Sequence, residues 1–291
     1  GPPDLGSRAT EHYPPRPLGQ GQGRQRRLIR SRTPYFSTGT GHHISRGFRT
    51  ILASDCLGPH GTVFGIRTVG CISVPRFPRL VVPGLPHHVT QRGVRRQRTF
   101  FDASDYAEYL DVALELLDEW PVTFWAYCLM PNHVHAVVVP DERDSLSKYF
   151  AALHRRYARR TNLRHDWLGH LWQKRFFSVV MDEVHTITAL RYVELNPVRA
   201  GICKRATDWR WSSVRANLGV AEDPLIDRSR TAQLVPDWGA LLSGADDQTS
   251  IERLRHETGT GRPVGSEAFM DAIESQTGRR VRKRRAGRKK K

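Results

Sequence analysis

The chain has 291 residues, 38% of them hydrophobic, and a formal net charge of +17. This length suffices for one large domain or two small ones with a buried core. No apolar run approaches the roughly 18 residues that a membrane span needs, and no signal-peptide pattern is present, so we expect a soluble, cytoplasmic protein with no membrane partner. The four cysteines form no CxxC pair, which argues against a zinc ribbon or a disulfide framework.

The positive charge belongs to the two ends of the chain. Residues 279–291 contribute +10 and residues 1–75 contribute +7, which together account for the whole net charge of +17. We interpret residues 1–75, rich in Gly, Pro, Arg and Ser, as a disordered or non-native extension. Residues 279–291 read as a disordered basic tail that attracts nucleic acid in a salt-sensitive way. Any nucleic-acid site between them must come from local arrangement.

Between the ends, periodicity predicts seven elements in the order β-α-β-β-α-β-α. They are a strand in 80–93, a helix over 104–120 with Ser104 as N-cap, strands over 122–130 and 133–140, a helix over 145–162, a strand in 169–182, and a helix over 184–201. This order predicts an α+β fold, a ferredoxin-like sandwich in which an antiparallel sheet carries helices on one face. Residues 76–203 would form this domain.

Residues 204–278 predict a helical C-terminal extension. A Trp-rich segment, ATDWRWSSVRANLG, is expected to pack back on the domain, and helices are expected near 231–242 and 249–257. A further short helix follows Ser266, which is a candidate N-cap.

The sharpest chemical signal is the pair His133 and His135 on an apolar strand, in MPNHVHAVV. Side chains alternate along a strand, so both imidazoles point to one face while Val134 points into the core. Their roots lie roughly 6–7 Å apart, which allows both to hold one divalent ion. Taken alone, the motif is more typical of two surface or hydrogen-bonded histidines.

The second signal is Tyr192 with Asn196, in RYVELNPVRAG. Their i, i+4 spacing places both on one helix face, and Pro197 should bend or end the helix there. Asn196 offers an amide oxygen as a hard metal ligand, and Tyr192 offers a phenol as nucleophile. A core tyrosine and an asparagine at a helix end is the simpler alternative.

Four spaced segments together resemble a known family. They are PRLVVPGLPHHVTQRG, YCLMPNHVHAVV, GHLWQKRFFS, and RYVELNPVRAG followed by WRWSS. In this order they resemble the REP-associated tyrosine transposases, within the HUH (histidine–hydrophobic–histidine) single-tyrosine transposases, over about residues 75–201. The resemblance continues more loosely to GRPVGSEAF.

The resemblance implies a catalytic domain over 76–203, with His133 and His135 as metal ligands, Asn196 as the third, and Tyr192 as nucleophile. Tyr149 and Tyr157 are rival tyrosines that do not match the family's catalytic position. Mg²⁺ or Mn²⁺ would bind the scissile phosphate and neutralise developing charge. Attack by the phenol would form a 5′-phosphotyrosine and release a 3′-OH.

The function so predicted is a transposase that cleaves and rejoins single-stranded or hairpin DNA at repeats, associated with the nucleoid. Two alternatives remain open: an inactive or domesticated nucleic-acid-binding regulator with the same fold, and a metal-dependent phosphodiesterase that uses water. Action as a monomer, or as a homodimer that exchanges the tyrosine helix, also remains open.

Three basic clusters are candidates for DNA binding despite the neutral centre. The candidates are Arg92, Arg95 and Arg96 after the first strand, Arg155, Arg156, Arg159 and Arg160 on the second helix, and Lys174 and Arg175 beside Trp172 and Phe176. The last cluster could combine phosphate contacts with base stacking. For the second helix, a solvated basic face is an equally good interpretation.

Overall fold

The computed structural model describes residues 79–245 and 247–282. The predicted extension over 1–75 lies outside the described residues, as do residues 283–291 of the predicted basic tail. The described residues all belong to one compact unit, Gly70–Lys291. None of the helices in this described part is long and apolar enough to cross a membrane.

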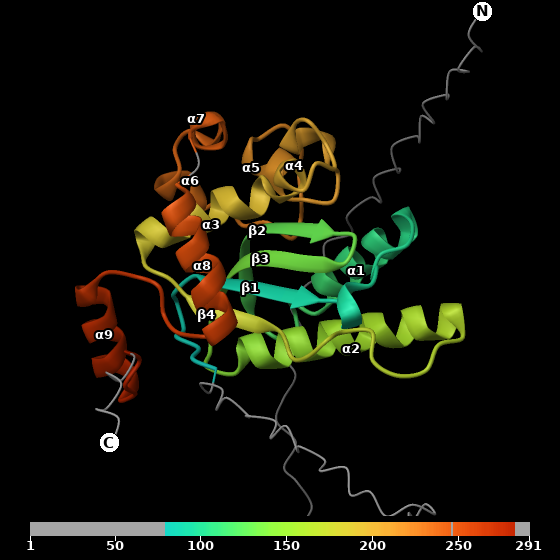
Figure 1. Ribbon diagram of the computed structural model, residues 1–291, viewed down its shortest axis with the longest axis horizontal. Helices are drawn as coiled ribbons and strands as arrows, with labels where there is room; N and C mark the ends of the chain where they lie inside the picture. The colour runs from blue at the N-terminus through green and yellow to red at the C-terminus, as the bar shows by residue number, and fades with distance from the viewer. Residues whose placement is uncertain (1–78, 246, 283–291) are drawn as a thin grey trace, which may run out of the picture. The chain divides into compact units, whose positions relative to one another are not determined.

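The centre of the fold is a four-stranded antiparallel sheet with the strand order β2-β3-β1-β4 (Figure 1). The strands are β1 (His87–Arg92), β2 (Val122–Met130), β3 (His133–Pro140) and β4 (Phe177–Val180). In the pairing of β1 with β3, His135 lies opposite Thr90 and His133 lies opposite Arg92. The predicted α+β fold is therefore confirmed, with the two histidines on a strand inside the sheet.

Helices cover both faces of this sheet. On one face, α1 (Ala103–Glu115) and α2 (Ser145–His165) pack against each other and enclose the larger hydrophobic core. On the other face, α3 (Glu183–Glu194) and α8 (Gln248–Thr260) pack together across the strands. The helices that the sequence predicted on one face of the sheet are thus α1 and α2. The third predicted helix, α3, and the C-terminal extension cover the other face.

The alternation of β3 decides which face carries the histidines. Val134, Ala136 and Val138 belong to the core beneath α1 and α2. Val137 belongs to the core beneath α3 and α8. Because side chains alternate along a strand, His133 and His135 share the face of Val137. The predicted orientation of Val134 into the core is confirmed.

Helix ends follow local side-chain chemistry. The expected N-cap Ser104 is wrong: α1 is capped by Asp102, whose carboxylate accepts from the backbone N–H groups of Ser104 and Asp105. An ionised carboxylate is the stronger acceptor, and Asp105 completes a capping box. Ser266 does cap α9 (Glu267–Thr277), accepting from Phe269.

The third predicted helix breaks where Pro197 required it. The helix α3 ends at Glu194, and a separate turn, α4 (Asn196–Arg199), follows after Leu195. Proline cannot donate the backbone hydrogen bond that would continue a helix. This break places Asn196 at the start of a new turn while keeping it beside Tyr192.

The predicted strand over 169–182 is only partly a strand. Residues 177–180 form β4, whereas residues 169–176 cross the ends of the sheet as irregular chain, fixed by hydrogen bonds from Val94 to Leu171 and from Gln173 to Arg92. The remaining short elements are η1 (Val94–Arg96), η2 (Ala206–Asp208), α5 (Val214–Asn217), α6 (Thr231–Leu234) and α7 (Trp238–Ser243).

The Trp-rich segment packs against the outer strand β2. Leu129 donates its backbone N–H to the carbonyl of Trp211, and the Trp209 indole donates to the carbonyl of Leu129. Ser213 bonds to both backbone groups of Tyr127. The segment thereby satisfies the open edge of the sheet. At the other end of the extension, Arg282 bonds the acidic side chains of α9.

Candidate active site and nucleic-acid interface

His133 and His135 lie side by side at the start of β3, with ring centres 5.0 Å apart. His135 is only 5% exposed. Burial, helped by the nearby Arg92 guanidinium, lowers the pKa of His133 to about 4. Burial also holds the pKa of His135 well below its usual range. Both imidazoles are therefore neutral at physiological pH, the form that binds metals.

Each ring uses its Nδ1 atom for a hydrogen bond inside the protein. Nδ1 of His133 lies 2.6 Å from Oδ1 of Asn132, and Nδ1 of His135 lies 3.0 Å from Nε2 of His88. Partners of this kind orient metal-binding histidines. The Nε2 atoms remain as the positions from which the two rings could bind one ion.

Asn196 lies next to this pair, as the resemblance implies. Its side chain hydrogen-bonds His133, which opposes the lowering of that pKa, and it is 8% exposed. Among the residues that the structure describes, no cluster of three or more His, Cys, Asp or Glu side chains is placed to hold a metal. The Asn196 amide oxygen, a hard ligand suited to Mg²⁺ or Mn²⁺, is the third protein atom that could join the two imidazoles in holding a metal.

Tyr192 faces the histidines from α3. Its ring centre lies 5.4 Å from that of His135 and 6.0 Å from that of His88, both edge-on. Its hydroxyl oxygen accepts a hydrogen bond from Nε of Arg255, at 3.3 Å. The guanidinium groups of Arg199 and Arg255 each lie 5.2 Å from the ring centre. The phenol oxygen is thus set in a positive environment.

A cavity of about 350 Å³ opens beside the tyrosine. Its walls include His88, His135 and Tyr192, together with Arg255 and Thr258 of α8. The structure thus brings together the four residues that the sequence predicted as ligands and nucleophile. It also adds three that sequence reasoning missed: His88, Arg255 and Thr258.

The rival tyrosines lie on the other face of the sheet. Tyr149 and Tyr157 on α2 are fully buried, and their hydroxyls donate to the carbonyls of Ala113 and Thr99, at 2.6 Å each. Burial raises the pKa of both phenols. Both residues stabilise the packing of α1 and α2 and are unsuited to attack a phosphate.

The arginines of α2 divide into two rows. Arg156, Arg160 and Arg164 point toward α1 and pair with its acidic side chains, which include Glu108 and Glu115. Arg156 also pairs with Glu119, just beyond the end of α1. Arg155 and Arg159, one residue earlier in each turn, pair with no carboxylate within the described part of the chain. The structure therefore separates a structural row from a row that is available to a ligand.

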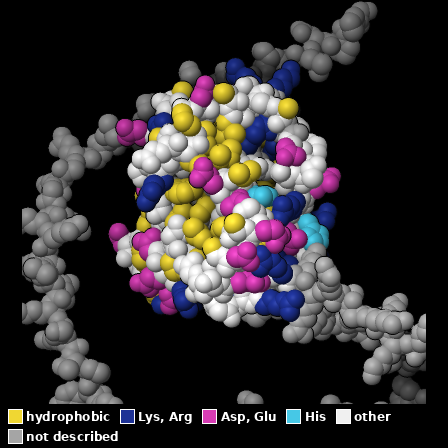
Figure 2. Space-filling model, turned by 90° about the vertical axis from the view of Figure 1, so that its left-hand side faces the viewer, with side chains coloured by type: hydrophobic (Ala, Val, Ile, Leu, Met, Phe, Trp, Pro, Cys, Tyr) yellow, Lys and Arg dark blue, Asp and Glu magenta, His cyan; other side chains and the backbone are white. Residues whose placement is uncertain are grey.

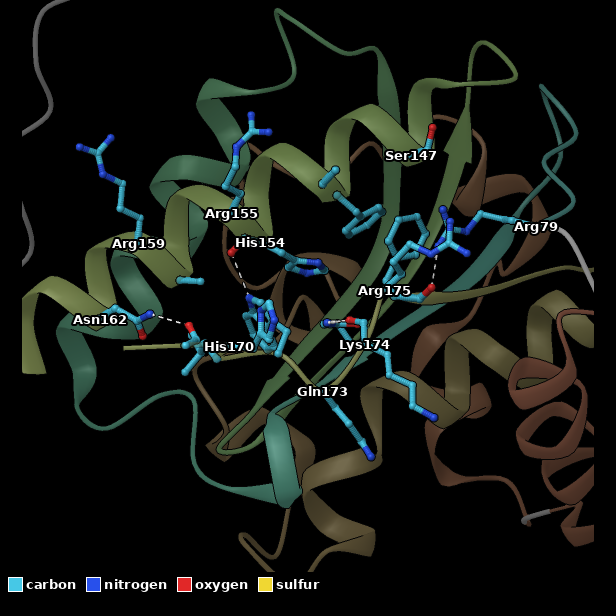
Figure 3. Close-up of a pocket in the computed structure, with 18 residues that line it drawn as sticks. Arg79, Ser147, His154, Arg155, Arg159, Asn162, His170, Gln173, Lys174 and Arg175 are labelled. Carbon is cyan, nitrogen blue, oxygen red and sulfur yellow. Dashed lines mark hydrogen bonds between the residues drawn. The ribbon is translucent and has the colours of Figure 1, made fainter. Parts of the chain in front are cut away.

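Arg155 and Arg159 line a cleft of about 790 Å³ between α2 and the segment over 169–176. Lys174 and Arg175 lie on its other wall, and Figure 3 shows His154 between the two walls. Aromatic rings form the floor of the cleft, since His154 packs against Trp172 and Phe150 packs against Phe176. Basic residues from two of the clusters predicted to bind DNA, on α2 and in residues 169–176, thus line one cleft.

The rim of this cleft holds two guanidinium groups close together. Arg79 stacks on the Phe176 ring, at 3.6 Å, and donates to the carbonyl of Phe176. Burial, with the nearby Arg175 guanidinium, lowers the pKa of Arg79 to about 10. Two neighbouring cations without a carboxylate between them favour an anion such as a phosphate.

The remaining predicted cluster, Arg92, Arg95 and Arg96, is split between a cavity and the exposed surface. Arg92 lines the smaller cavity beside His135. Arg95 and Arg96 are exposed in the η1 turn, both with left-handed backbone, at φ 52° and 63°. On the face drawn in Figure 2, by contrast, basic and acidic side chains are interspersed around an apolar area. Positive charge is therefore gathered locally and does not cover the whole surface.

Comparison with known proteins finds similarity to one family and to several of its relatives. The family model described as "Transposase IS200 like" matches residues 82–196. A putative REP-associated tyrosine transposase of Haemophilus influenzae is 24% identical over 159 residues, covering 50% of this chain and 84% of that protein. A REP-associated tyrosine transposase of Escherichia coli is 21% identical over 121 residues, covering 41% and 71%.

Among solved structures, this chain is similar to that of a REP-associated tyrosine transposase bound to a REP hairpin. The TM-score is 0.44 and the identity is 18%, and the match covers 53% of this chain and 97% of that one. The segment matched by the family model runs from just before β1 to Asn196. It includes both histidines and Tyr192, whereas α8 lies beyond it.

Proposed function

We propose that this protein is a transposase that cleaves and rejoins single-stranded DNA at hairpin-forming repeats, with Tyr192 as the nucleophile. The observation that carries the proposal is the placement of the Tyr192 ring 5.4 Å from that of His135, at the wall of a cavity. The name of the matched hairpin-bound transposase supports hairpin DNA as the substrate.

In the proposed reaction the Tyr192 oxygen attacks a DNA phosphorus and loses its proton. A bond forms between that oxygen and phosphorus, and the bond to the 3′ oxygen breaks, so the strand ends as a 3′-OH and a 5′-phosphotyrosine. The phosphodiester energy is kept in the tyrosine link, which allows rejoining by attack of another 3′-OH. A bound Mg²⁺ or Mn²⁺ would supply charge neutralisation at the phosphate.

The chain's own side chains have distinct parts in this reaction. His133, His135 and Asn196 would hold the ion. Arg255 donates to the Tyr192 oxygen, so a fixed positive charge faces the oxygen on which negative charge develops during attack. The phenol is held by packing on α3, so it is positioned before DNA binds.

The cleft between α2 and residues 169–176 would hold a flanking single strand. Arg155, Arg159, Lys174 and Arg175 offer contacts to phosphates, and the aromatic floor offers stacking for an unpaired base. Arg156 and Arg160, which were also candidates for DNA contact, pair with acidic residues of α1 instead.

The test is to incubate the full chain with hairpin DNA carrying single-stranded flanks and Mn²⁺, and to look for a covalent protein–DNA adduct. Tyr192→Phe should abolish the adduct, and the matched control Tyr157→Phe should retain it. DNA binding without cleavage by the wild type would favour the regulator hypothesis. Cleavage that survives Tyr192→Phe would favour a phosphodiesterase that uses water.

A further inference from the structure

A chain of hydrogen bonds connects the candidate metal site to helix α8. Nδ1 of His135 lies 3.0 Å from Nε2 of His88, and Nδ1 of His88 lies 2.9 Å from Oγ1 of Thr258. That hydroxyl lies 2.7 Å from the backbone oxygen of Leu254, one turn earlier. All four residues are at most 5% exposed, so water competes little for these bonds.

The donor and the acceptor of each hydrogen bond in this series can be assigned from the final bond, the one between Thr258 and Leu254. A backbone carbonyl only accepts, so the Thr258 hydroxyl donates its one hydrogen to Leu254. Toward His88 the same oxygen must accept, which places a hydrogen on Nδ1 of His88. A neutral imidazole carries one N–H, so Nε2 of His88 accepts from Nδ1 of His135. The Nε2 atom of His135 is then left with a free lone pair.

We propose that His88 and Thr258 are positioning residues that hold His135 in the tautomer whose Nε2 binds the divalent ion. The proposal deepens the proposed function and rests on it. It assigns part of the metal site to α8, which lies outside the segment matched by the family model.

The tautomer of His133 is set in the same way, through a shorter series of hydrogen bonds. Its Nδ1 lies 2.6 Å from Oδ1 of Asn132, and the amide of Asn132 is oriented because its Nδ2 donates to the carbonyl of Arg96. Oδ1 of Asn132 accepts, so the hydrogen is on Nδ1, and Nε2 is the nitrogen left for the ion and for Asn196, whose side chain bonds the same ring. Both rings of the pair therefore present the same nitrogen, as two ligands of one ion must.

Loss of the Thr258 hydroxyl should reverse the direction of the hydrogen bond between His88 and His135. In Thr258→Val, Nδ1 of His88 faces a methyl group and has no acceptor inside a buried site. The favoured alternative moves the His88 hydrogen to Nε2, from which it donates to Nδ1 of His135. The hydrogen of His135 then occupies Nε2 and blocks the ion. Thr258→Ser keeps the hydroxyl and should keep the original direction.

The experiment compares wild type, Thr258→Val and Thr258→Ser, all as full chains. Thr260→Val serves as the matched control, since Thr260 lies on the same helix and its hydroxyl bonds only Glu257 and Arg262 among the described residues. Free Mn²⁺ is titrated by electron paramagnetic resonance, and the His135 tautomer is determined from ¹⁵N chemical shifts without metal. Circular dichroism confirms that each variant is folded.

We expect Thr258→Val to bind Mn²⁺ about 10-fold to 100-fold more weakly and to shift the His135 hydrogen from Nδ1 to Nε2. The other two variants should match the wild type in both measurements. Wild-type affinity in folded Thr258→Val, or a wild-type His135 already protonated on Nε2, would overturn the proposal. Absence of Mn²⁺ binding by the wild type would instead overturn the metal site of the proposed function, while the nitrogen shifts still decide the tautomer.

Discussion

Glu194, two residues after the candidate nucleophile, is a buried carboxylic acid whose ionisation should control stability. It is 0% exposed, and its Oε1 accepts from the Ser213 hydroxyl and the Asn217 amide, at 2.7 Å each. Its other oxygen has no partner in the described part of the chain. Burial raises the pKa of Glu194 from 4.5 to about 8, against the opposing effect of the two hydrogen bonds.

The sign and size of the effect follow from linkage. Because the pKa is raised on folding, the stabilising contribution is fully present below pH 4.5 and is lost as the pH rises through about 8. A difference of about 3.5 pH units corresponds to at most about 5 kcal/mol, at about 1.4 kcal/mol per unit. Between pH 6 and pH 8 the folded chain should lose about 2 kcal/mol from this group.

Glu194→Gln isolates this contribution. The amide keeps an oxygen that can accept from Ser213 and Asn217, but it never ionises. Every other titrating group is common to both chains, so it cancels in their difference. The assay is urea unfolding followed by tryptophan fluorescence at pH 6, 7 and 8, with linear extrapolation to water. The wild type should weaken relative to Glu194→Gln by about 2 kcal/mol over this range. Parallel stability curves would refute the reasoning.

Two further predictions concern DNA binding and the turn beneath the site. Arg159→Gln should weaken single-stranded DNA binding and reduce the slope of log affinity against log salt concentration by about 0.7. Arg160→Gln should leave the affinity unchanged and lower the free energy of unfolding by at most about 1 kcal/mol. Fluorescence anisotropy at several salt concentrations measures both affinities, and equal losses would contradict the two-row division of α2. In Gly93→Ala the new Cβ would lie 2.5 Å from the carbonyl oxygen of Gln97, so it should destabilise by about 1–3 kcal/mol; an unchanged thermal midpoint would show that the turn relaxes.

The sequence predicted the parts of the site that obey local periodicity. The alternation of β3 is enough to place His133 and His135 on one face, and helical spacing is enough to place Tyr192 beside Asn196. The structure adds that the strand and the helix meet, which the resemblance implied and which no local pattern could show. The strand expected over 169–182 was too long because its first half contacts Arg92 and Val94 at the end of the sheet, a long-range constraint without a local signal.

The charge pattern shows the same limit more sharply. Arg155, Arg156, Arg159 and Arg160 are chemically equivalent in the sequence, and all four were candidates for DNA contact. Only the packing of α1 against α2 separates them, because acidic side chains of α1 and Glu119 just after it neutralise one row. The acidity of residues 104–120 was visible in the sequence, but its pairing with every fourth residue of α2 depends on the crossing of the two helices.

The two histidines of the candidate metal site differ in how their chemistry is specified. The tautomer of His133 is set by Asn132, the residue before it, so this half of the site is specified within the MPNHVH motif. His135 takes its tautomer through His88 from Thr258, which lies more than one hundred residues later. A short motif can therefore place both rings on one face and still leave one of them in the wrong protonation state. It follows that a variant lacking α8 should keep the histidine pair and lose the metal affinity, and that a match to the motif alone is insufficient to infer a competent site.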